Sequence, residues 1–163
     1  MFWEVAGTKL TSREAATARV YEFHASPHFG TIVAIPGAFE ALCALRSEFE
    51  LHIVTSRQHD IAPQTRDCIE KYFPGIFTEC HFGNHFGTSG TKVSKPEMCA
   101  RIGAVALVDD SLDYARQCAQ AGIPVCLFGD YAWNQPSAEL PGSVARATSW
   151  REVGPRLKAL LHH

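Results

Sequence analysis

The sequence predicts an α/β protein whose strands form a parallel sheet. Short apolar runs rich in β-branched residues alternate with segments of helical period. Alternation of this kind implies right-handed βαβ crossovers and helices layered on a sheet. The length of 163 residues suits one domain, and 46% hydrophobic with 20% charged residues is a globular composition. Disordered, collagen-like and coiled-coil classes are therefore excluded.

Caps and breakers place the elements of the first half. A helix is expected from a cap at Thr11–Ser12 to about Ala25, with Pro27 stopping it. Pro36–Gly37 opens a second helix that runs to about Glu48. The elements expected next are a strand at 51–55, a helix at about 63–72, a strand at about 77–82 and a Gly-rich loop at 83–90.

The clearest strand is the unbroken apolar run Val105–Val108, which ends in Asp109–Asp110. Such runs are typical of strands buried on both faces, as in parallel sheets. Pro96 suits the first turn of a helix that ends near Ile102, just before this strand. The remaining expectations are a helix at 112–121, a strand at 124–128, an irregular stretch at 129–148 and a closing helix at 150–161.

Charge and cysteine content restrict the partners and the compartment. The net charge is −2 and the Lys and Arg residues are dispersed, so no basic stripe indicates nucleic acid or an anionic membrane. No apolar run reaches the length of a membrane span, and the first residues do not resemble a secretory leader. We expect a cytoplasmic protein with reduced, buried thiols at its six cysteines, Cys43, Cys68, Cys80, Cys99, Cys118 and Cys126.

Polar clusters follow three of the expected strands, at the point where each strand ends. They are Thr55-Ser56-Arg57, Asp109-Asp110-Ser111 and Gly129-Asp130. Ligands of open parallel sheets bind beside the carboxyl ends of the strands, so these clusters predict a shared site. Lys95 reaches the same edge if the loop before it crosses there. Hydroxyls, an ammonium and Mg²⁺-binding carboxylates are groups that handle phosphate.

Three stretches of the chain resemble motifs of the haloacid dehalogenase (HAD) superfamily of phosphohydrolases. His52–Arg57 is similar to the second motif, which implies that Thr55, with Ser56 and Arg57 beside it, binds the phosphoryl group. Val93–Cys99 is similar to the third motif. The resemblance assigns its lysine to Lys95, with Lys92 the weaker alternative.

A fourth motif is similar to Leu107–Ser111 and implies Mg²⁺ ligands and catalytic carboxylates at Asp109 and Asp110. The chain also resembles the 5'(3')-deoxyribonucleotidase-like branch over nearly its whole length. This implies a HAD-like Rossmannoid three-layer sandwich at 35–163 and a remnant of a helical cap at 1–34. The segments that carry this closer resemblance are Val20–Phe23, Ser26–Phe29, Ile35–Ala38, Gly129–Asn134 and Ser149–Trp150.

The sequence departs from the family at the nucleophile. HAD phosphatases begin with a central strand that ends in Asp-x-Asp, a pattern found nowhere in this sequence. The first aspartate is Asp60, which follows the second motif, and Met1–Gly7 is instead similar to the middle of a cap. The resemblance therefore implies a sheet that lacks its central first strand and a site that lacks its attacking carboxylate.

Two consequences follow for structure and chemistry. Thr55, Lys95 and Asp109 could bind and polarise a phosphate but not attack it. The strands that end at Thr55 and Asp109 would leave backbone groups unpaired. They must therefore pair directly, accept a substitute strand such as Phe2–Ala6, or borrow a strand from another chain, which favours a homodimer.

Three functions stay open at this point. The first is a phosphatase or nucleotidase relative with weakened Mg²⁺ binding that is inactive or very weak. The second is a phosphate- or nucleotide-binding or regulatory protein, with a phosphorylated small molecule as its partner. The third is an active Mg²⁺-dependent phosphatase with a rearranged nucleophile or one supplied by a partner chain.

Structural roles compete with each functional one. Asp109-Asp110 could cap a helix together with Ser111, and Lys95 could be a solvated lysine at a helix start. Cys80, His81 and His85 lack the paired spacing of a zinc site. Trp133 and Asn134 could line a nucleotide pocket by resemblance, although an aromatic residue in a loop more often packs on its own sheet.

Overall fold

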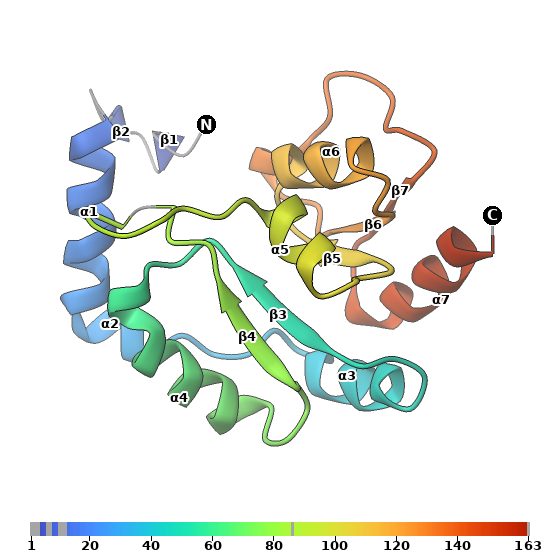
Figure 1. Cartoon of the computed structure of the whole chain (residues 1–163), viewed down its shortest axis with the longest axis horizontal. Helices are drawn as coiled ribbons and strands as arrows, with labels where there is room; N and C mark the ends of the chain where they lie inside the picture. The colour runs from blue at the N-terminus through green and yellow to red at the C-terminus, as the bar shows by residue number, and fades with distance from the viewer. Residues whose placement is uncertain (1–3, 6–7, 10–12, 86, 163) are drawn as a thin grey trace.

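The computed structural model describes residues 4–5, 8–9, 13–85 and 87–162, and it is a mixed α/β structure with parallel strands (Figure 1). The helices are α1 (Arg13–Ala25), α2 (Pro27–Gly30), α3 (Ala38–Arg46), α4 (Ala62–Tyr72), α5 (Lys95–Arg101), α6 (Leu112–Gln120) and α7 (Trp150–Leu161), with 3₁₀ turns η1 (His59–Ile61) and η2 (Ala132–Asn134). The strands are β1 (Glu4–Val5), β2 (Thr8–Lys9), β3 (His52–Thr55), β4 (Glu79–Phe82), β5 (Leu107–Asp109), β6 (Val125–Phe128) and β7 (Val144–Ala147).

The larger parallel sheet has the order β5-β6-β7 and lies between two layers of helices. Alternate residues of β6 point to opposite faces, as the pleat of a strand requires. Val125 and Leu127 pack with residues of α5 and α6, and Cys126 and Phe128 pack with residues of α3 and α7. All four of these β6 side chains are buried, so the sheet carries a core on each face.

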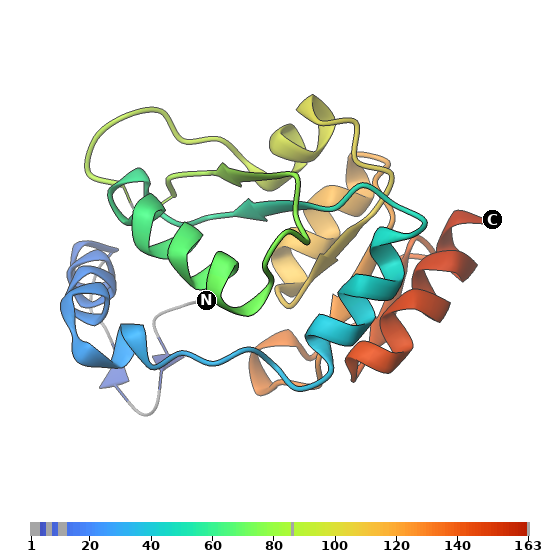
Figure 2. The same ribbon diagram turned by 90° about the horizontal axis from the view of Figure 1, so that it is seen from below.

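The smaller parallel sheet is the pair β3-β4, with α4 beside it (Figures 1 and 2). The Arg66 guanidinium of α4 stacks over the Phe82 ring of β4 at 5.1 Å from the ring centroid. The Tyr21 hydroxyl of α1 donates at 2.9 Å to the carboxylate of Asp60, which lies in η1 just before α4. The first contact attaches α4 to β4, and the second attaches α1 to η1.

The two parallel sheets do not join. In the described part of the chain β3 pairs only with β4, and β5 pairs only with β6, so direct pairing of β3 with β5 does not occur. The predicted substitute strand Phe2–Ala6 is wrong in its described portion, because Glu4–Val5 pairs with Thr8–Lys9 in an antiparallel hairpin. Its other residues lie outside the described ones.

Most predicted elements are confirmed within a few residues, and the closing helix has the predicted bounds. The cap at Thr11–Ser12 lies outside the described residues. Pro27 both ends α1 and opens α2 as its first residue, because a proline needs no N–H donor at that position. The prediction of an irregular stretch at 129–148 is wrong at β7, whose Val-Ala-Arg-Ala sequence lacks the apolar alternation that marks a strand.

Among the described helices, none combines the length and apolar character that crossing a membrane requires.

The six cysteines fall into different environments, which corrects the expectation that all are buried. Cys99, Cys118 and Cys126 are buried, whereas Cys43 is exposed on α3. Burial raises the pKa of the Cys126 thiol to about 11, and a hydrogen bond shared with Cys99, followed by burial, raises the pKa of Cys118. The thiolate is the reactive form, so these two thiols are protected from alkylation both by their burial and by their raised pKa.

We therefore expect iodoacetamide at pH 8 to alkylate Cys43 rapidly in the native protein and to reach Cys118 and Cys126 only after denaturation. Peptide mass spectrometry after timed quenching measures each rate, and Cys43→Ser removes the fast phase. Equal rates at Cys43 and Cys126 would contradict the burial described here.

Candidate functional site

A buried ion pair lies at the carboxyl ends of the strands. The Lys95 ammonium contacts the Asp109 carboxylate, with only 11% and 4% of their side chains exposed. Lys95 is the first residue of α5, whose N-cap Ser94 accepts from the Glu97 N–H, and Asp109 is the last residue of β5. Lys92, the alternative lysine, is exposed. The structure therefore brings together two of the residues that the sequence assigned to one site.

Both oxygens of the Asp109 carboxylate have a partner. Its Oδ1 accepts from the Ser111 N–H at 2.9 Å, while its Oδ2 faces Lys95. The Ser111 hydroxyl in turn caps α6 by accepting from the Tyr114 N–H at 3.4 Å. The capping role considered for this turn is therefore confirmed for Ser111. Asp109, at the end of β5, accepts from the Ser111 N–H and so holds the capping residue in position.

A hydrogen-bonded chain connects the end of β3 to α6. The Ser56 hydroxyl donates to the Tyr114 hydroxyl at 2.8 Å, and that oxygen lies 2.9 Å from Nδ1 of His85. His85 Nε2 lies 2.9 Å from the Val93 carbonyl. Because a carbonyl can only accept, Nε2 carries the hydrogen and Nδ1 accepts from Tyr114.

Tyr114 lies at the centre of the site and was not predicted from the sequence. The Lys95 ammonium lies 4.7 Å from the centroid of its ring, so Tyr114 contacts both the ion pair and Ser56. No motif marks this residue. Its position three residues after Ser111, in the first turn of a helix that begins at the carboxyl end of a strand, is the only local indication in the sequence.

Thr55 and Arg57 take different directions. The Thr55 hydroxyl accepts from the Arg57 N–H at 3.3 Å, which holds the turn after β3. The Arg57 guanidinium donates to the Thr65 hydroxyl at 3.1 Å and lies 5.4 Å over the Phe29 ring. These partners lie in α2 and α4, and the structure does not bring this side chain to Lys95 or Asp109.

Asp110 is exposed and points to a different partner from Asp109. Its Oδ2 accepts from the Trp133 indole N–H at 3.2 Å. A Mg²⁺ site needs free carboxylate oxygens that converge, and Asp109 has both oxygens engaged with an ammonium beside one of them. The residues present do not fit the Mg²⁺ site that the HAD resemblance implied at Asp109 and Asp110.

The loop after β6 is held by buried Asn134. Asn134 is fully buried and donates to the carbonyls of Phe128 and Asp110, at 2.9 and 3.1 Å. Trp133 is 66% exposed and stacks on Tyr131 at a centroid distance of 4.4 Å. Asn134 is therefore structural, and Asp130 of the third polar cluster is exposed, with its carboxylate accepting from Gln135.

A second polar cluster lies on one face of the β3-β4 pair. His52, Glu79 and His81 each offer one ligand atom, and these atoms all lie within 4.8 Å of one another. The His52 Nδ1 to His81 Nε2 distance is 3.3 Å. Two imidazoles and a carboxylate could hold Zn²⁺ rather than Mg²⁺. Of the triplet weighed from the sequence only His81 belongs to this cluster, because Cys80 points away and His85 bonds to Tyr114.

No protein-family model, no curated protein and no solved structure matches this chain.

Proposed function

We propose that the site formed by Lys95, Asp109, Ser56 and Tyr114 binds the phosphate group of a small molecule. The observation that carries the proposal is the Lys95–Asp109 pair, which lies beside hydroxyl donors where β3 and β5 end. Asp109 holds the ammonium in place, and an ammonium with three donors can still donate to a phosphate oxygen. The Thr55 hydroxyl accepts from the Arg57 N–H and keeps its own hydrogen for a ligand, and the Ser56 hydroxyl would donate to phosphate by turning away from Tyr114.

Binding is favoured over phosphoryl transfer by an attacking carboxylate. Asp109 is bonded to Lys95 and to the Ser111 N–H, so it is not free to act as a nucleophile. The motif resemblance to HAD phosphohydrolases supports phosphate as the ligand, and the sequence lacks the Asp-x-Asp of that family. A HAD-like phosphate-binding protein, inactive or very weak as a phosphatase, is the function proposed.

We expect isothermal titration calorimetry at low ionic strength to show that inorganic phosphate binds. Two single variants, Ser56→Ala and Lys95→Met, should each weaken this binding. A hydrogen bond to a charged group contributes about 1.5–3 kcal/mol, so removal of the Lys95 ammonium should raise Kd by about 10-fold or more. Ser56→Ala removes a neutral donor, and a smaller increase of about 5-fold is expected.

Lys92→Ala is the matched control, because it removes an exposed lysine three residues from Lys95 and keeps the site. Circular dichroism establishes that each variant is folded before titration. Equal affinity of the native chain, Ser56→Ala and Lys95→Met for phosphate, or no heat at millimolar phosphate, would refute the proposal.

A second candidate function rests on the chain from Ser56 through Tyr114 to His85. In this function Ser56 Oγ attacks the phosphorus of a monoester, an O–P bond forms and the bond to the leaving alcohol breaks. The Ser56 proton passes to Tyr114 while the Tyr114 proton passes to His85 Nδ1, and the imidazolium then protonates the leaving alkoxide. Water later hydrolyses the phosphoserine.

p-Nitrophenyl phosphate distinguishes the two functions. The second candidate predicts a burst of p-nitrophenol, with phosphate on Ser56 detected by mass spectrometry and lost in Ser56→Ala and His85→Ala. Phosphate binding without burst or phosphoserine supports binding alone.

A further inference from the structure

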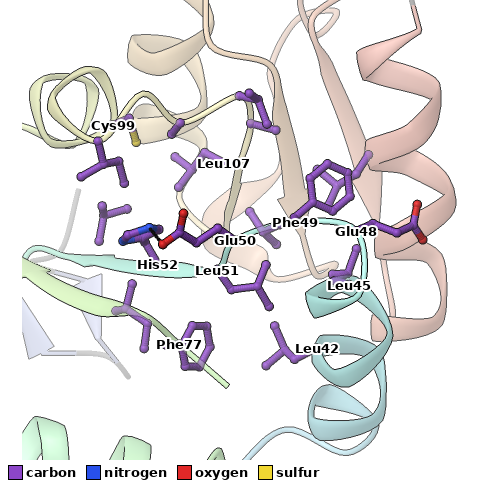
Figure 3. A pocket seen from close by; sticks show the side chains of 18 of the residues that line it. Leu42, Leu45, Glu48, Phe49, Glu50, Leu51, His52, Phe77, Cys99 and Leu107 are labelled. Carbon is purple, nitrogen blue, oxygen red and sulfur yellow. Dashed lines mark ion pairs between the residues drawn. The ribbon is translucent and has the colours of Figure 1, made fainter. Parts of the chain in front are cut away.

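The facing edges of β3 and β5 border an open cavity of about 520 Å³, which we call the slot (Figure 3). One edge is His52–Val54 and the other is Ala106–Val108. Its walls are mostly apolar: Leu42 and Leu45 of α3 lie on one side, and Cys99 of α5 lies on the other. The slot therefore has a strand at each edge and helices on both faces.

The strands at the two edges run in the same direction. Their amino-terminal flanks, 48–51 and 103–105, line the slot together. At the opposite end, Ser56 after β3 bonds to Tyr114 of α6, the helix that follows β5. The sheets β4-β3 and β5-β6-β7 thus flank the slot with all strands parallel, as though one position between them were open.

On the side of the slot, the backbone of β3 has no strand partner among the residues that the structure describes. Neighbouring residues of a strand direct their N–H and C=O groups to opposite sides. The Leu51 and Thr55 carbonyls accept from the N–H groups of Thr78 and Gly83, so the odd-numbered residues face β4. The N–H and C=O groups of His52 and Val54 therefore face the slot.

Within the described part of the chain, the edge of β5 toward the slot also has no strand partner. The Leu107 N–H donates to the Pro124 carbonyl at 2.9 Å, so Leu107 and Asp109 face β6. Ala106 and Val108 then direct their N–H and C=O groups into the slot from the other side. Backbone groups that lack partners in a mostly apolar cavity cost free energy, and an inserted strand would satisfy both rows at once.

We propose that the slot is the docking site for one extended, apolar strand of a partner polypeptide, inserted parallel to β3 and β5. Strand addition uses backbone hydrogen bonds for affinity and side-chain pockets for selectivity. Here both edges of the added strand would pair, and its side chains would alternate between the faces of α3 and α5. The partner strand is therefore apolar on both faces.

Charge at the entrance identifies the flank of that strand. Glu48 and Glu50 line the amino-terminal end of the slot. The Glu48 carboxylate already pairs with Lys158 at 2.8 Å, whereas the partner of Glu50 among the described residues is the His52 imidazole, at 3.5 Å (Figure 3). A basic residue just before the apolar strand complements Glu50. The segment before this chain's own β3 is acidic instead, which disfavours a second copy donating that strand.

The test uses a fluorescein-labelled peptide made of a lysine, five alternating valine and isoleucine residues, and a serine. We expect saturable binding in fluorescence anisotropy. A matched peptide with alternate backbone amides N-methylated keeps the side chains but loses donors, so its binding should be weaker by about 10-fold or more. Equal binding of the two peptides would overturn strand pairing.

Hydrogen exchange followed by NMR tests the register residue by residue. The amides of Val54, Ala106 and Val108 should exchange rapidly in the free chain and slow by about 10-fold or more with the peptide. The Leu107 amide, already bonded to Pro124, is the internal control and should stay protected in both states. Uniform protection, or no change at the three amides, would overturn the proposal.

Two further arms test the occupant. If the amides of Val54 and Val108 are protected in the free monomer, β3 and β5 pair directly, and if they are protected only in a dimer seen by sedimentation, a second copy fills the slot. Either result overturns the assignment to a partner. Glu50→Lys should weaken binding of the peptide that carries lysine by about 3-fold. A peptide with glutamate in place of that lysine should bind Glu50→Lys more tightly than the native chain.

Val108→Pro removes one N–H that faces the slot and leaves the β5-β6 ladder intact, as prolines at sheet edges do. We expect the variant to fold and to bind the peptide more weakly. The N-methylated peptide tests the same bond from the other side, so the proposal stays falsifiable if this variant does not fold.

Discussion

Asp109→Ala should lower the free energy of unfolding by about 3–5 kcal/mol, because it leaves the Lys95 ammonium buried without its counter-ion. The side chains of Asp109 and Lys95 are 4% and 11% exposed, so the ammonium left without its carboxylate would stay largely out of contact with water. The substitution also removes the acceptor of the Ser111 N–H. Urea denaturation followed by circular dichroism measures the loss.

The control is a surface pair on the same helix. Arg101 pairs with Glu97 at 2.6 Å, with 63% and 50% of the side chains exposed, so Arg101→Ala should cost about 0–1 kcal/mol. A loss in Asp109→Ala no larger than in Arg101→Ala would contradict the buried pair.

A double variant separates stability from binding. Lys95→Met with Asp109→Asn removes both charges, and the asparagine oxygen still accepts from the Ser111 N–H. Replacement of both partners of a buried ion pair is often nearly neutral, so stability should return to within about 1 kcal/mol of the native chain. Phosphate binding should stay lost, because the ammonium is absent. A stable double variant that binds phosphate normally would refute the role proposed for Lys95.

The sequence predicted the strand ends of the site because local patterns determine them. Thr55 follows an apolar strand, Asp109 ends the longest apolar run, and Pro96 marks the helix that begins at Lys95. Parallel strands place such ends at one edge, so Thr55 and Asp109 were expected there. Lys95 was expected to join them only if the loop before it crosses to that edge, and its contact with Asp109 bears this out.

Side-chain direction could not be predicted in the same way. Arg57 follows Ser56 directly, yet Ser56 bonds to Tyr114 and Arg57 to Thr65, because successive residues of an extended segment point to opposite sides. Asp109 and Asp110 separate for the same reason, and the expected Mg²⁺ site separates with them. Tyr114 and His85 come from segments without a motif, so only the folded chain places them together.

Long-range pairing limits prediction of the sheet as well. Both parallel sheets follow from their apolar runs, but the space between β3 and β5 depends on what the rest of the chain can supply. β7 was missed because Arg146 interrupts a short alanine-rich strand. In the structure its guanidinium donates to the Asn134 side-chain and main-chain oxygens at 3.0 and 2.7 Å. The local sequence does not predict these two hydrogen bonds.

Asn134→Ala should lower the free energy of unfolding by about 3 kcal/mol, because each buried polar group left without a partner costs about 1–3 kcal/mol. The amide oxygen accepts from the Tyr131 N–H at 3.1 Å and from Arg146, and the amide nitrogen donates to the Phe128 and Asp110 carbonyls. A methyl group can replace none of these bonds. Guanidinium denaturation followed by circular dichroism measures the loss.

Gln135→Ala is the matched control, since it removes the neighbouring amide from an exposed position. The Gln135 amide donates to the Asp130 carboxylate at 2.7 Å in contact with water, so its loss should change stability by less than about 0.5 kcal/mol. Asn134 also donates to the Asp110 carbonyl, so Asn134→Ala should loosen the turn that follows Asp109 and weaken phosphate binding. Equal stability of Asn134→Ala and Gln135→Ala would show that the buried amide does not hold this loop against the site.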